Sequence, residues 1–298
     1  MAENLHDLRR RITSVKNTRK ITQAMKAVSA AKLRRSISEL NRLKPMLGKI
    51  EDVLGRVGKS PEAAEHPFLE EREQGDTFIV AISSDKGLCG AFNSHIIEKA
   101  VERFEQIAEG GEQPSLIIVG KKIHKYFSKK NYHVDKSYDS LMAGLSYPDA
   151  KALSAFLQEI YLNEKKNIKK IEFIYTAFTS ASQQEIVTRS LFPIAAQWQE
   201  EEAEEETGSS EDIEYIFEPS AVEIFQSLLP LYIDSLVYRV LLDSSASEHA
   251  ARMIAMDLAT RNAGDMIKGL TLTLNKLRQA SITNELLEII TATEALKK

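Results

Sequence analysis

A run of small and apolar residues at alternating steps of three and four is the strongest constraint on the fold. It keeps this step over eight positions: Met253, Met256, Thr260, Ala263, Ile267, Leu270, Leu274 and Leu277. The pattern is typical of a helix that packs along a second helix. A similar stripe lies upstream at Leu236 and Val240, and the stripe resumes downstream after a shift of phase at Ile282, Leu286 and Ile289.

The C-terminal region from about residue 220 to 296 is long for a helix in a globular core. At ~1.5 Å per residue it would span roughly 115 Å if it were nearly continuous. Pro230 lies about three turns after its start, so we expect a bend or break near Leu229. The pattern therefore predicts a shaft.

The N-terminal region carries the same kind of stripe. It begins at Leu5, Leu8, Ile12 and Val15, resumes after a phase shift at Ile21, Met25 and Val28, and continues at Leu40, Leu43, Leu47, Ile50, Leu54 and Val57. We expect a kink at Pro45 and a helix end near Gly55 or Gly58. Two such helices at opposite ends of one chain predict an antiparallel coiled coil.

The middle of the chain has a different period. Short β-rich runs occur at 77–83, 116–119, 171–176 and 185–189, and helical stretches lie between them at 93–108, 121–130 and 149–165. This alternation predicts a Rossmann-like α/β domain with a largely parallel sheet and a last short strand at 215–217. The predicted boundaries are 1–58 for the N-terminal coiled-coil helix, 59–218 for the α/β domain and 219–298 for the C-terminal helix.

Composition excludes some classes of protein. Hydrophobic residues make up 43% and charged residues 28%, and no stretch approaches 18 uncharged apolar residues, so we expect no membrane span. The first residues lack the apolar core of a targeting peptide, and the single cysteine, Cys89, excludes an intrachain disulfide.

Charge is distributed unevenly along the chain. Residues 1–35 hold ten Lys and Arg against two acidic residues, whereas residues 200–214 hold nine acidic side chains and no basic one. We expect the acidic stretch 200–212 to be a solvated loop that is dispensable for assembly. The basic helix has three interpretations: a nucleic-acid surface, an ordinary charged coiled-coil exterior, or a positive collar that faces acidic protein loops.

No catalytic, cofactor or metal site is predicted. Gly58-Lys59-Ser60 resembles the end of a phosphate-binding loop, but Val53 stands where that loop requires glycine. The glycines of residues 86–90 follow a predicted strand and could hold an anion, although a structural turn is the default interpretation. The six histidines lack metal-ligand spacing.

Four segments carry a family resemblance: residues 9–35 (RRRITSVKNTRKITQAMKAVSAAKLRR), 83–93 (SSDKGLCGAFN), 247–264 (SEHAARMIAMDLATRNAG) and 282–296 (ITNELLEIITATEAL). In this order they resemble the gamma subunit of F-type ATP synthase over nearly the whole chain. Two features depart from the family pattern. Ala292-Thr293 replaces the usual Gly-Ala, and the acidic stretch after Trp198 is longer than expected.

The resemblance implies a central rotor shaft that couples proton flow to ATP synthesis or hydrolysis without catalysing either. The implied partners are three alpha and three beta subunits, epsilon and the membrane c-ring, whose polar loops Tyr215 and Glu218 would meet. No cofactor and no nucleic acid is implied. The implied location is peripheral, on the cytoplasmic side of a bacterial inner membrane, with membrane association only through the c-ring.

The resemblance also assigns contacts near the collar. Met25 would face an acidic lever loop of beta, with Lys26 beside it. The loop 86–93, which contains Lys86 and Cys89, would lie against the lower rim of beta.

Further contacts are implied on the C-terminal helix. Arg278 and Gln279 resemble a pair that hydrogen-bonds to loops of beta and alpha inside the ring. Glu285 and Glu288 occupy the acidic positions of the terminal signature. Without the resemblance, each of these residues is an ordinary solvated residue.

Two alternatives remain. One is a cytosolic coiled-coil scaffold with an anion- or nucleic-acid-binding surface. The other is a nucleotide-binding enzyme, which lacks any phosphate motif. Co-purification with alpha, beta and epsilon distinguishes the rotor shaft from the scaffold.

Overall fold

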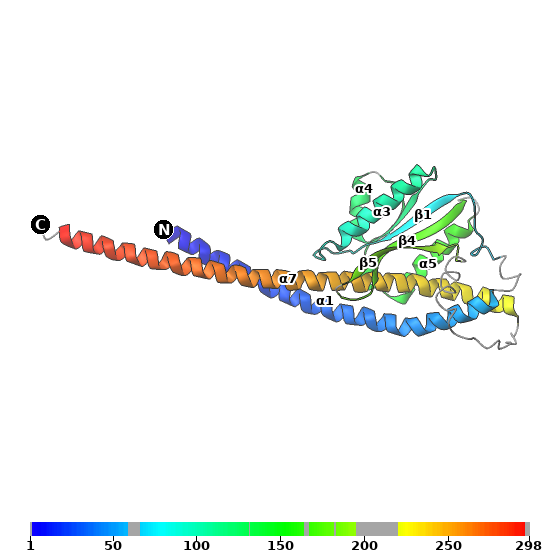
Figure 1. The fold of residues 1–298 in the computed structure, drawn as a ribbon, viewed down its shortest axis with the longest axis horizontal. Helices are drawn as coiled ribbons and strands as arrows, with labels where there is room; N and C mark the ends of the chain where they lie inside the picture. The colour runs from blue at the N-terminus through cyan, green and yellow to red at the C-terminus, as the bar shows by residue number, and fades with distance from the viewer. Residues whose placement is uncertain are drawn as a thin grey trace. The chain divides into compact units, whose positions relative to one another are not determined.

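The structure is a computed structural model that describes residues 2–58, 66–130, 132–163, 167–181, 183–194 and 220–295. Two long helices enclose the α/β elements in the sequence (Figure 1). The elements are α1 (Ala2–Val57), β1 (Asp76–Ile82), α3 (Phe92–Glu109), β2 (Ser115–Val119), α4 (Lys121–Lys129), β3 (Val134–Tyr138), the 3-10 helix η1 (Leu141–Gly144), α5 (Tyr147–Leu162), β4 (Ile168–Phe178), β5 (Gln184–Phe192) and α7 (Ala221–Ala295).

The described residues form two compact units. The shaft unit contains α1 up to Ala30 and α7 from Arg252 onward, and the sheet unit runs from Ala31 to Ala251. Both long helices therefore pass from one unit to the other without a loop. Some sequence-based predictions concern residues that the structure does not describe: the phosphate-loop comparison at Lys59 and Ser60, the acidic stretch 200–212 and the strand 215–217.

The sheet has the strand order β3-β2-β1-β4-β5. The neighbouring strands from β3 to β4 pair in parallel, whereas β4 and β5 pair in antiparallel fashion. Val80 of β1 lies opposite Ile117 of β2 and Phe173 of β4. The predicted α/β domain with a largely parallel sheet is confirmed. Sequence reasoning missed β3, because VDKSY is a polar edge strand without an apolar run.

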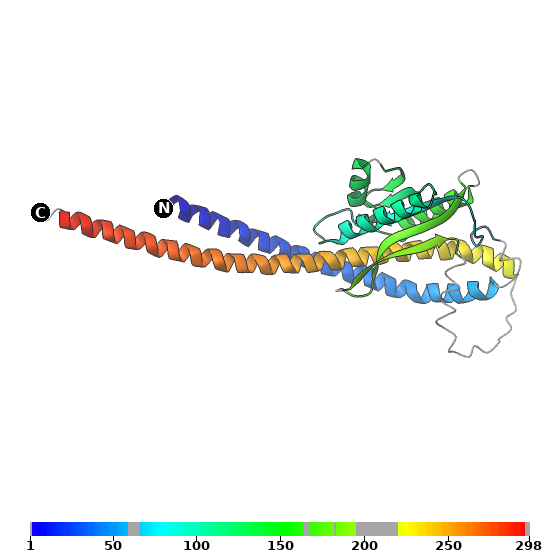
Figure 2. The ribbon, with the colours of Figure 1, turned by 45° about the horizontal axis from the view of Figure 1, so that its top comes forward.

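Two helical layers cover the sheet. Alternate residues of β1 point to opposite faces: Ile79 and Ala81 pack with α3 and α4, whereas Val80 and Ile82 pack with α5 and with the parts of α1 and α7 in the sheet unit. Figure 2 shows α3 and α4 together on one face of the sheet. The predicted helix 149–165 begins earlier, at Tyr147, because Ser146 and Asp149 form a capping box.

In the sheet unit α1 and α7 run antiparallel. Ser36 and Ser245 hydroxyls lie 3.3 Å apart, and further along α1 the Tyr232 hydroxyl donates to Glu51 Oε1 at 3.2 Å. The predicted stripe from Leu40 to Val57 is buried or half-buried at every position. This part of the predicted coiled coil is confirmed.

In the shaft unit the predicted α7 stripe is also confirmed, since all eight residues from Met253 to Leu277 are buried or half-buried. The predicted phase shift in α1 is wrong. Ile21 and Val28 are 60% and 58% exposed, whereas Thr22 and Ser29 are 8% and 3% exposed. The stripe keeps its phase through small hydroxyl side chains, and the Thr22 and Thr260 hydroxyls lie 2.7 Å apart. An assignment that counts apolar residues alone cannot detect such positions.

The predicted stripe beyond Leu277 does not meet α1. Ile282, Leu286 and Ile289 are 50%, 55% and 63% exposed. The helices are antiparallel, and Thr22 lies beside Thr260. The first residues of α1 therefore lie opposite positions of α7 that precede Ile282, and no described part of α1 covers Ile282 and the residues after it. These side chains form an apolar surface on the shaft unit.

Both internal prolines lie within helices. α1 continues through Pro45 and ends at Val57, as expected. α7 continues through Pro230, so no break occurs near Leu229. Leu229 is fully buried and Pro230 is exposed, which directs the ring to solvent while apolar neighbours hold the helix on the sheet.

No membrane span was expected, yet one described helix passes a test of length and composition. Within Val222–Thr293, one window of 18 residues reaches a mean hydropathy of 1.2, sufficient by length and composition alone. However, 56% of that window is buried in the fold. Its apolar side chains, such as Phe225 and Ile233, pack in the core of the sheet unit.

Candidate functional site

The turn of residues 83–93 lies at the carboxyl end of β1, where open α/β sheets commonly bind ligands (Figure 1). Its own polar groups bond to one another. The Ser84 hydroxyl donates to Lys86 O at 2.6 Å, the Ser84 N–H donates to Asn93 Oδ1 at 3.0 Å, and Asn93 Nδ2 donates to Cys89 Sγ at 3.1 Å. Because these groups are bonded to one another, the segment is better described as a structural turn than as an anion-binding loop.

The predicted contact residues of this turn differ in exposure. Cys89 is 1% exposed and packs with Phe92 and Ile96, so its thiol is an anchor of the turn. Lys86 is exposed. Asp85 was not singled out from the sequence, yet its Oδ1 accepts the N–H groups of Lys121 at 3.1 Å and Ser140 at 2.9 Å. Asp85 thereby joins the residues that follow β1, β2 and β3.

Of the predicted contact pair on α1, Lys26 bonds to α7. Met25 is half-buried, and Lys26 Nζ donates to Asp257 Oδ1 at 2.6 Å. Asp257 also pairs with Arg261 at 2.6 Å, and the hydrogen bond from Lys26 is the main cause that lowers the pKa of Asp257. Sequence spacing could suggest the Asp257–Arg261 pair, four residues apart, but the partner of Lys26 requires the register between the helices.

The remaining predicted residues lie on α7 or outside the described chain. Arg278, Gln279, Glu285 and Glu288 are all exposed. Glu285 Oε1 accepts a hydrogen bond from the Ser281 hydroxyl at 3.3 Å. The predicted foot residues Tyr215 and Glu218 lie outside the described residues, and the contacts of all these positions with partners stay predictions.

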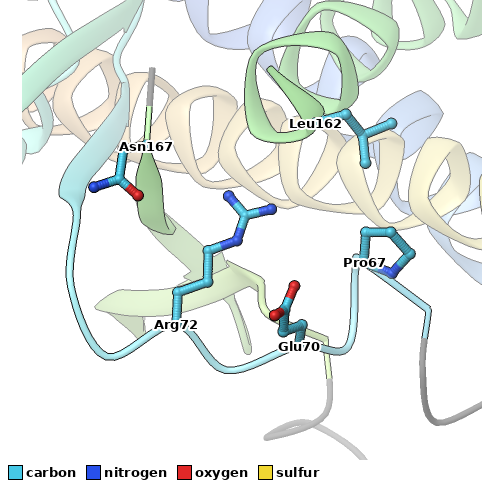
Figure 3. Close-up of a pocket in the computed structure, with 5 residues that line it drawn as sticks. All are labelled: Pro67, Glu70, Arg72, Leu162 and Asn167. Atoms are coloured by element: carbon cyan, nitrogen blue, oxygen red, sulfur yellow. The ribbon is translucent and has the colours of Figure 1, made fainter. Parts of the chain in front are cut away.

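A shallow hollow of about 340 Å³ is lined by Pro67, Glu70, Arg72, Leu162 and Asn167 (Figure 3). Its cation is already engaged in the fold. Arg72 Nη1 donates to the carbonyl oxygens of Tyr161 and Ile168 at 3.1 and 2.7 Å, and the guanidinium lies 4.4 Å from the centre of the Tyr161 ring. Arg72 therefore links the C-terminal end of α5 to the start of β4. Among the described residues, no group of three or more His, Cys, Asp or Glu side chains is arranged to hold a metal ion.

Comparison with known proteins identifies the family. The ATP synthase family model matches residues 4–296. An ATP synthase gamma chain from Geobacter metallireducens is 43% identical over 296 residues, and one from Pelotomaculum thermopropionicum is 40% identical over 294 residues; each match covers 99% of both chains. The chain belongs to the ATP synthase gamma chain family. The resemblance carried by the four sequence segments is therefore confirmed.

Solved structures agree with this assignment. A chain from the central stalk and c-ring of Tetrahymena thermophila mitochondrial ATP synthase is 26% identical, with a TM-score of 0.56, and the match covers 80% of this gamma-family chain and 99% of that chain. A chain from Euglena gracilis mitochondrial ATP synthase shares the fold at 19% identity, with a TM-score of 0.64 and coverage of 99% and 95%.

This gamma-family chain also contains buried charges that sequence reasoning missed. Glu172 of β4 has a side chain only 1% exposed, and it accepts two hydrogen bonds from Arg103 of α3, both at 2.8 Å. Lys170 lies 2.7 Å from the same carboxylate. Burial raises the pKa of Glu172, but the hydrogen bonds from Arg103 and Lys170 outweigh burial and lower it overall. The pair fixes α3 on the sheet.

Asp243 on α7 is the opposite case. Burial raises its pKa to about 6, against the opposing effects of Arg239, Arg189 and a hydrogen bond with the Phe178 backbone. Tyr175 also lies close, and its own pKa is raised by burial first and by Asp243 second. At neutral pH the fold therefore carries a carboxylate that its surroundings disfavour.

We expect Asp243→Asn to raise the free energy of unfolding by about 1 kcal/mol or more at pH 7.5, because each pKa unit corresponds to ~1.4 kcal/mol. The folded pKa exceeds the unfolded value, so the folded wild type binds more protons between about pH 4 and 6 and its stability falls as pH rises through that window. The advantage of the variant should thus shrink as pH falls from 6 to 4. Urea titrations at several pH values measure it; a pH-independent difference would contradict the assignment.

Proposed function

We propose that this chain is the central rotor shaft of an F-type ATP synthase and couples proton flow through the membrane sector to ATP synthesis or hydrolysis at the alpha/beta ring. The observation that carries the proposal is the match to gamma chains over 99% of the chain, together with a paired α1–α7 shaft. The chain itself is non-catalytic. The alternative of a cytosolic scaffold is not supported.

The physical basis is differential contact. A shaft changes which conformation of a catalytic subunit is favoured only if it contacts the alternative conformations with different free energies. The faces of the α1–α7 pair differ: the α1 surface is basic and carries the exposed Ile21 and Val28, whereas on α7 the carboxylates of Asp257 and Asp265 are paired with Arg261 and Lys268. Rotation of such a shaft offers each surrounding subunit a different surface in turn.

The finer assembly belongs to the same proposal. The partners are three alpha and three beta subunits, epsilon and the c-ring, on which Tyr215 and Glu218 form part of the foot. The complex lies peripherally on the cytoplasmic side of a bacterial inner membrane. The proposed division assigns residues 1–58 and 219–298 to the two coiled-coil helices and residues 59–218 to the α/β domain.

The contact residues are assigned by the family motifs. Met25 and Lys26 face the acidic lever loop of beta, and the loop containing Lys86 and Cys89 lies on the lower rim of beta. The exposure of Lys86 supports a direct contact, whereas the burial of Cys89 supports an indirect one.

The assignments on α7 concern the interior of the ring. Arg278 and Gln279 bond to ring loops, and Glu285 and Glu288 lie further along α7. All four side chains are exposed on α7, which supports their availability to a partner.

Assembly tests the proposal. The full-length chain, co-expressed with alpha, beta and epsilon, is expected to co-purify with them. The resulting complex is expected to restore ATP-driven proton pumping to membranes from which the gamma subunit is missing. The purified chain alone is expected to show no saturable ATP binding. Salt-sensitive binding to nucleic acid without co-purification of these subunits would instead support the scaffold.

A substitution at Met25 tests the collar. Met25→Lys is expected to assemble normally and to retain substantial ATP hydrolysis but to pump few protons per ATP. A charge replaces an apolar side chain beside carboxylates, and a new ion pair of ~1 kcal/mol must then break at every step. Met25→Leu is the control and should pump nearly as many protons per ATP as wild type. Full pumping by Met25→Lys, measured as acidification per phosphate released, would refute the placement of Met25 at beta.

A further inference from the structure

Leu88 has an unfavourable backbone conformation and an exposed side chain. Its φ is 63° and the residue is 64% exposed. A left-handed backbone is disfavoured for residues other than glycine, and asparagine, aspartate and other short polar residues tolerate it best. The other two non-glycine residues with positive φ among those described are Ser140 and Asn167, which are polar. Leu88 gains no compensation from burial.

The surrounding turn fixes this conformation from both sides. Before Leu88, Asp85 is tied to the residues that begin α4 and follow β3, as described above. After it, Cys89 and Phe92 are buried at 1% and 5% exposure in the layer under α3 and α4. Two anchored segments thus leave residues 86–88 outside the core. Strained residues held in this way occur frequently at functional contacts.

Cations occur in this turn and at the start of α4. Lys86, Lys121 and Lys122 are exposed. A Cβ atom at Gly87 would lie 3.4 Å from Lys122 Nζ, so the ammonium group of α4 lies directly against the turn. The protruding surface therefore combines one apolar side chain with a positively charged border.

We propose that Leu88 is the residue through which this turn binds the alpha/beta ring, by insertion into an apolar recess bordered by carboxylates. The inference rests on the proposed function and deepens it. The family resemblance assigned the contact to Lys86 and Cys89, but Cys89 is buried and Leu88 is the large apolar side chain that the turn exposes. Burial of an exposed leucine supplies affinity, and the lysines supply orientation and speed of association.

Leu88→Gly separates a contact from a structural role. Glycine accepts φ of 63° without strain, so the isolated full-length variant should keep or raise its melting temperature. The same variant should bind a reconstituted alpha/beta ring about ten-fold more weakly, as expected when roughly half to all of a leucine side chain stays in water. Both quantities are measured, the first by circular dichroism and the second by dissociation of fluorescently labelled chain.

Matched variants define the outcomes. Ser140→Gly removes a second left-handed strain nearby without removing an apolar side chain, and it should bind like wild type; Leu88→Met should also bind within about two-fold of wild type, since its apolar area is similar. Binding by Leu88→Gly within two-fold of wild type overturns this inference alone. A parallel loss of melting temperature and affinity in Leu88→Gly also overturns it. Failure of the wild-type chain to bind the ring overturns the proposed function as well.

The charged border has a separate readout. Lys121→Gln with Lys122→Gln should slow association with the ring and reduce its dependence on salt between 50 and 300 mM, because exposed charges act mainly through screened attraction. If the double variant shows the same salt dependence as wild type, the inference that carboxylates border the recess is wrong.

Discussion

Replacing Leu47 with alanine is expected to lower the free energy of unfolding of the sheet unit by about 3 kcal/mol. Leu47 is 1% exposed and lies in the core shared by α1, α5, α7 and the sheet. The same substitution at Leu274, which is half-buried in the shaft unit, is expected to cost about 1 kcal/mol, because roughly half as much apolar area is lost. The coiled-coil pattern is equally regular at both positions, so the difference comes from burial.

Hydrogen exchange of the full-length variants in mild urea measures the two units separately. Leu47→Ala should accelerate exchange in the strands, whereas Leu274→Ala should accelerate it only in the shaft unit, that is, in α1 up to Ala30 and in α7 from Arg252 onward. Lys276→Gln, at an exposed position, serves as the control and should change little. Equal destabilisation by the two leucine variants would show that the sheet-unit core does not dominate stability.

Arg103→Met should also be strongly destabilising, by about 3 kcal/mol, because it leaves the buried carboxylate of Glu172 with Lys170 as its remaining cation. The lowered pKa of Glu172 gives the sign of the pH dependence. Its ion pair stabilises the fold above the unfolded pKa of about 4.3, and this contribution is lost as pH falls through the lower folded pKa. The penalty of Arg103→Met should therefore be largest near neutral pH.

The double variant Arg103→Met with Glu172→Leu is the informative control. Removing both charges should recover much of the lost stability, since an apolar pair can replace a buried ion pair at little cost. Thermal unfolding of the two single variants and the double variant at pH 7 gives the coupling free energy. Additive losses would mean that the 2.8 Å pair does not determine the stability of α3 on the sheet.

Regular apolar spacing predicted the helices well, and the residues that escaped prediction share a physical reason. The α7 stripe from Met253 onward was readable because its side chains are apolar or small and their period is constant. Thr22 and Ser29 of α1 were missed because the α1 stripe was assigned from apolar residues alone, whereas Thr260 was counted in the α7 stripe as a small residue. Helix register, and with it the Lys26–Asp257 pair, depends on both helices at once and cannot be obtained from either alone.

The candidate site was predictable only as a motif. The family pattern located the turn of residues 83–93, but exposure within it depends on three-dimensional packing. Cys89 faces the core and Leu88 faces solvent because the left-handed backbone at Leu88 redirects the chain between them. Likewise, Arg103 and Glu172 lie 69 positions apart, and no local signal connects them.

The hydroxyl-containing stripe of α1 has a consequence for biosynthesis. Residues up to Ala30 are synthesised before their partners from Arg252 onward. At about 5–20 residues per second, that interval lasts roughly 10 to 45 s. A nascent helix with leucine or isoleucine at every position that later faces α7 would expose a continuous apolar surface for that time. With Thr22 and Ser29 at two of these positions, α1 has less apolar surface to expose during that interval than such a helix would have.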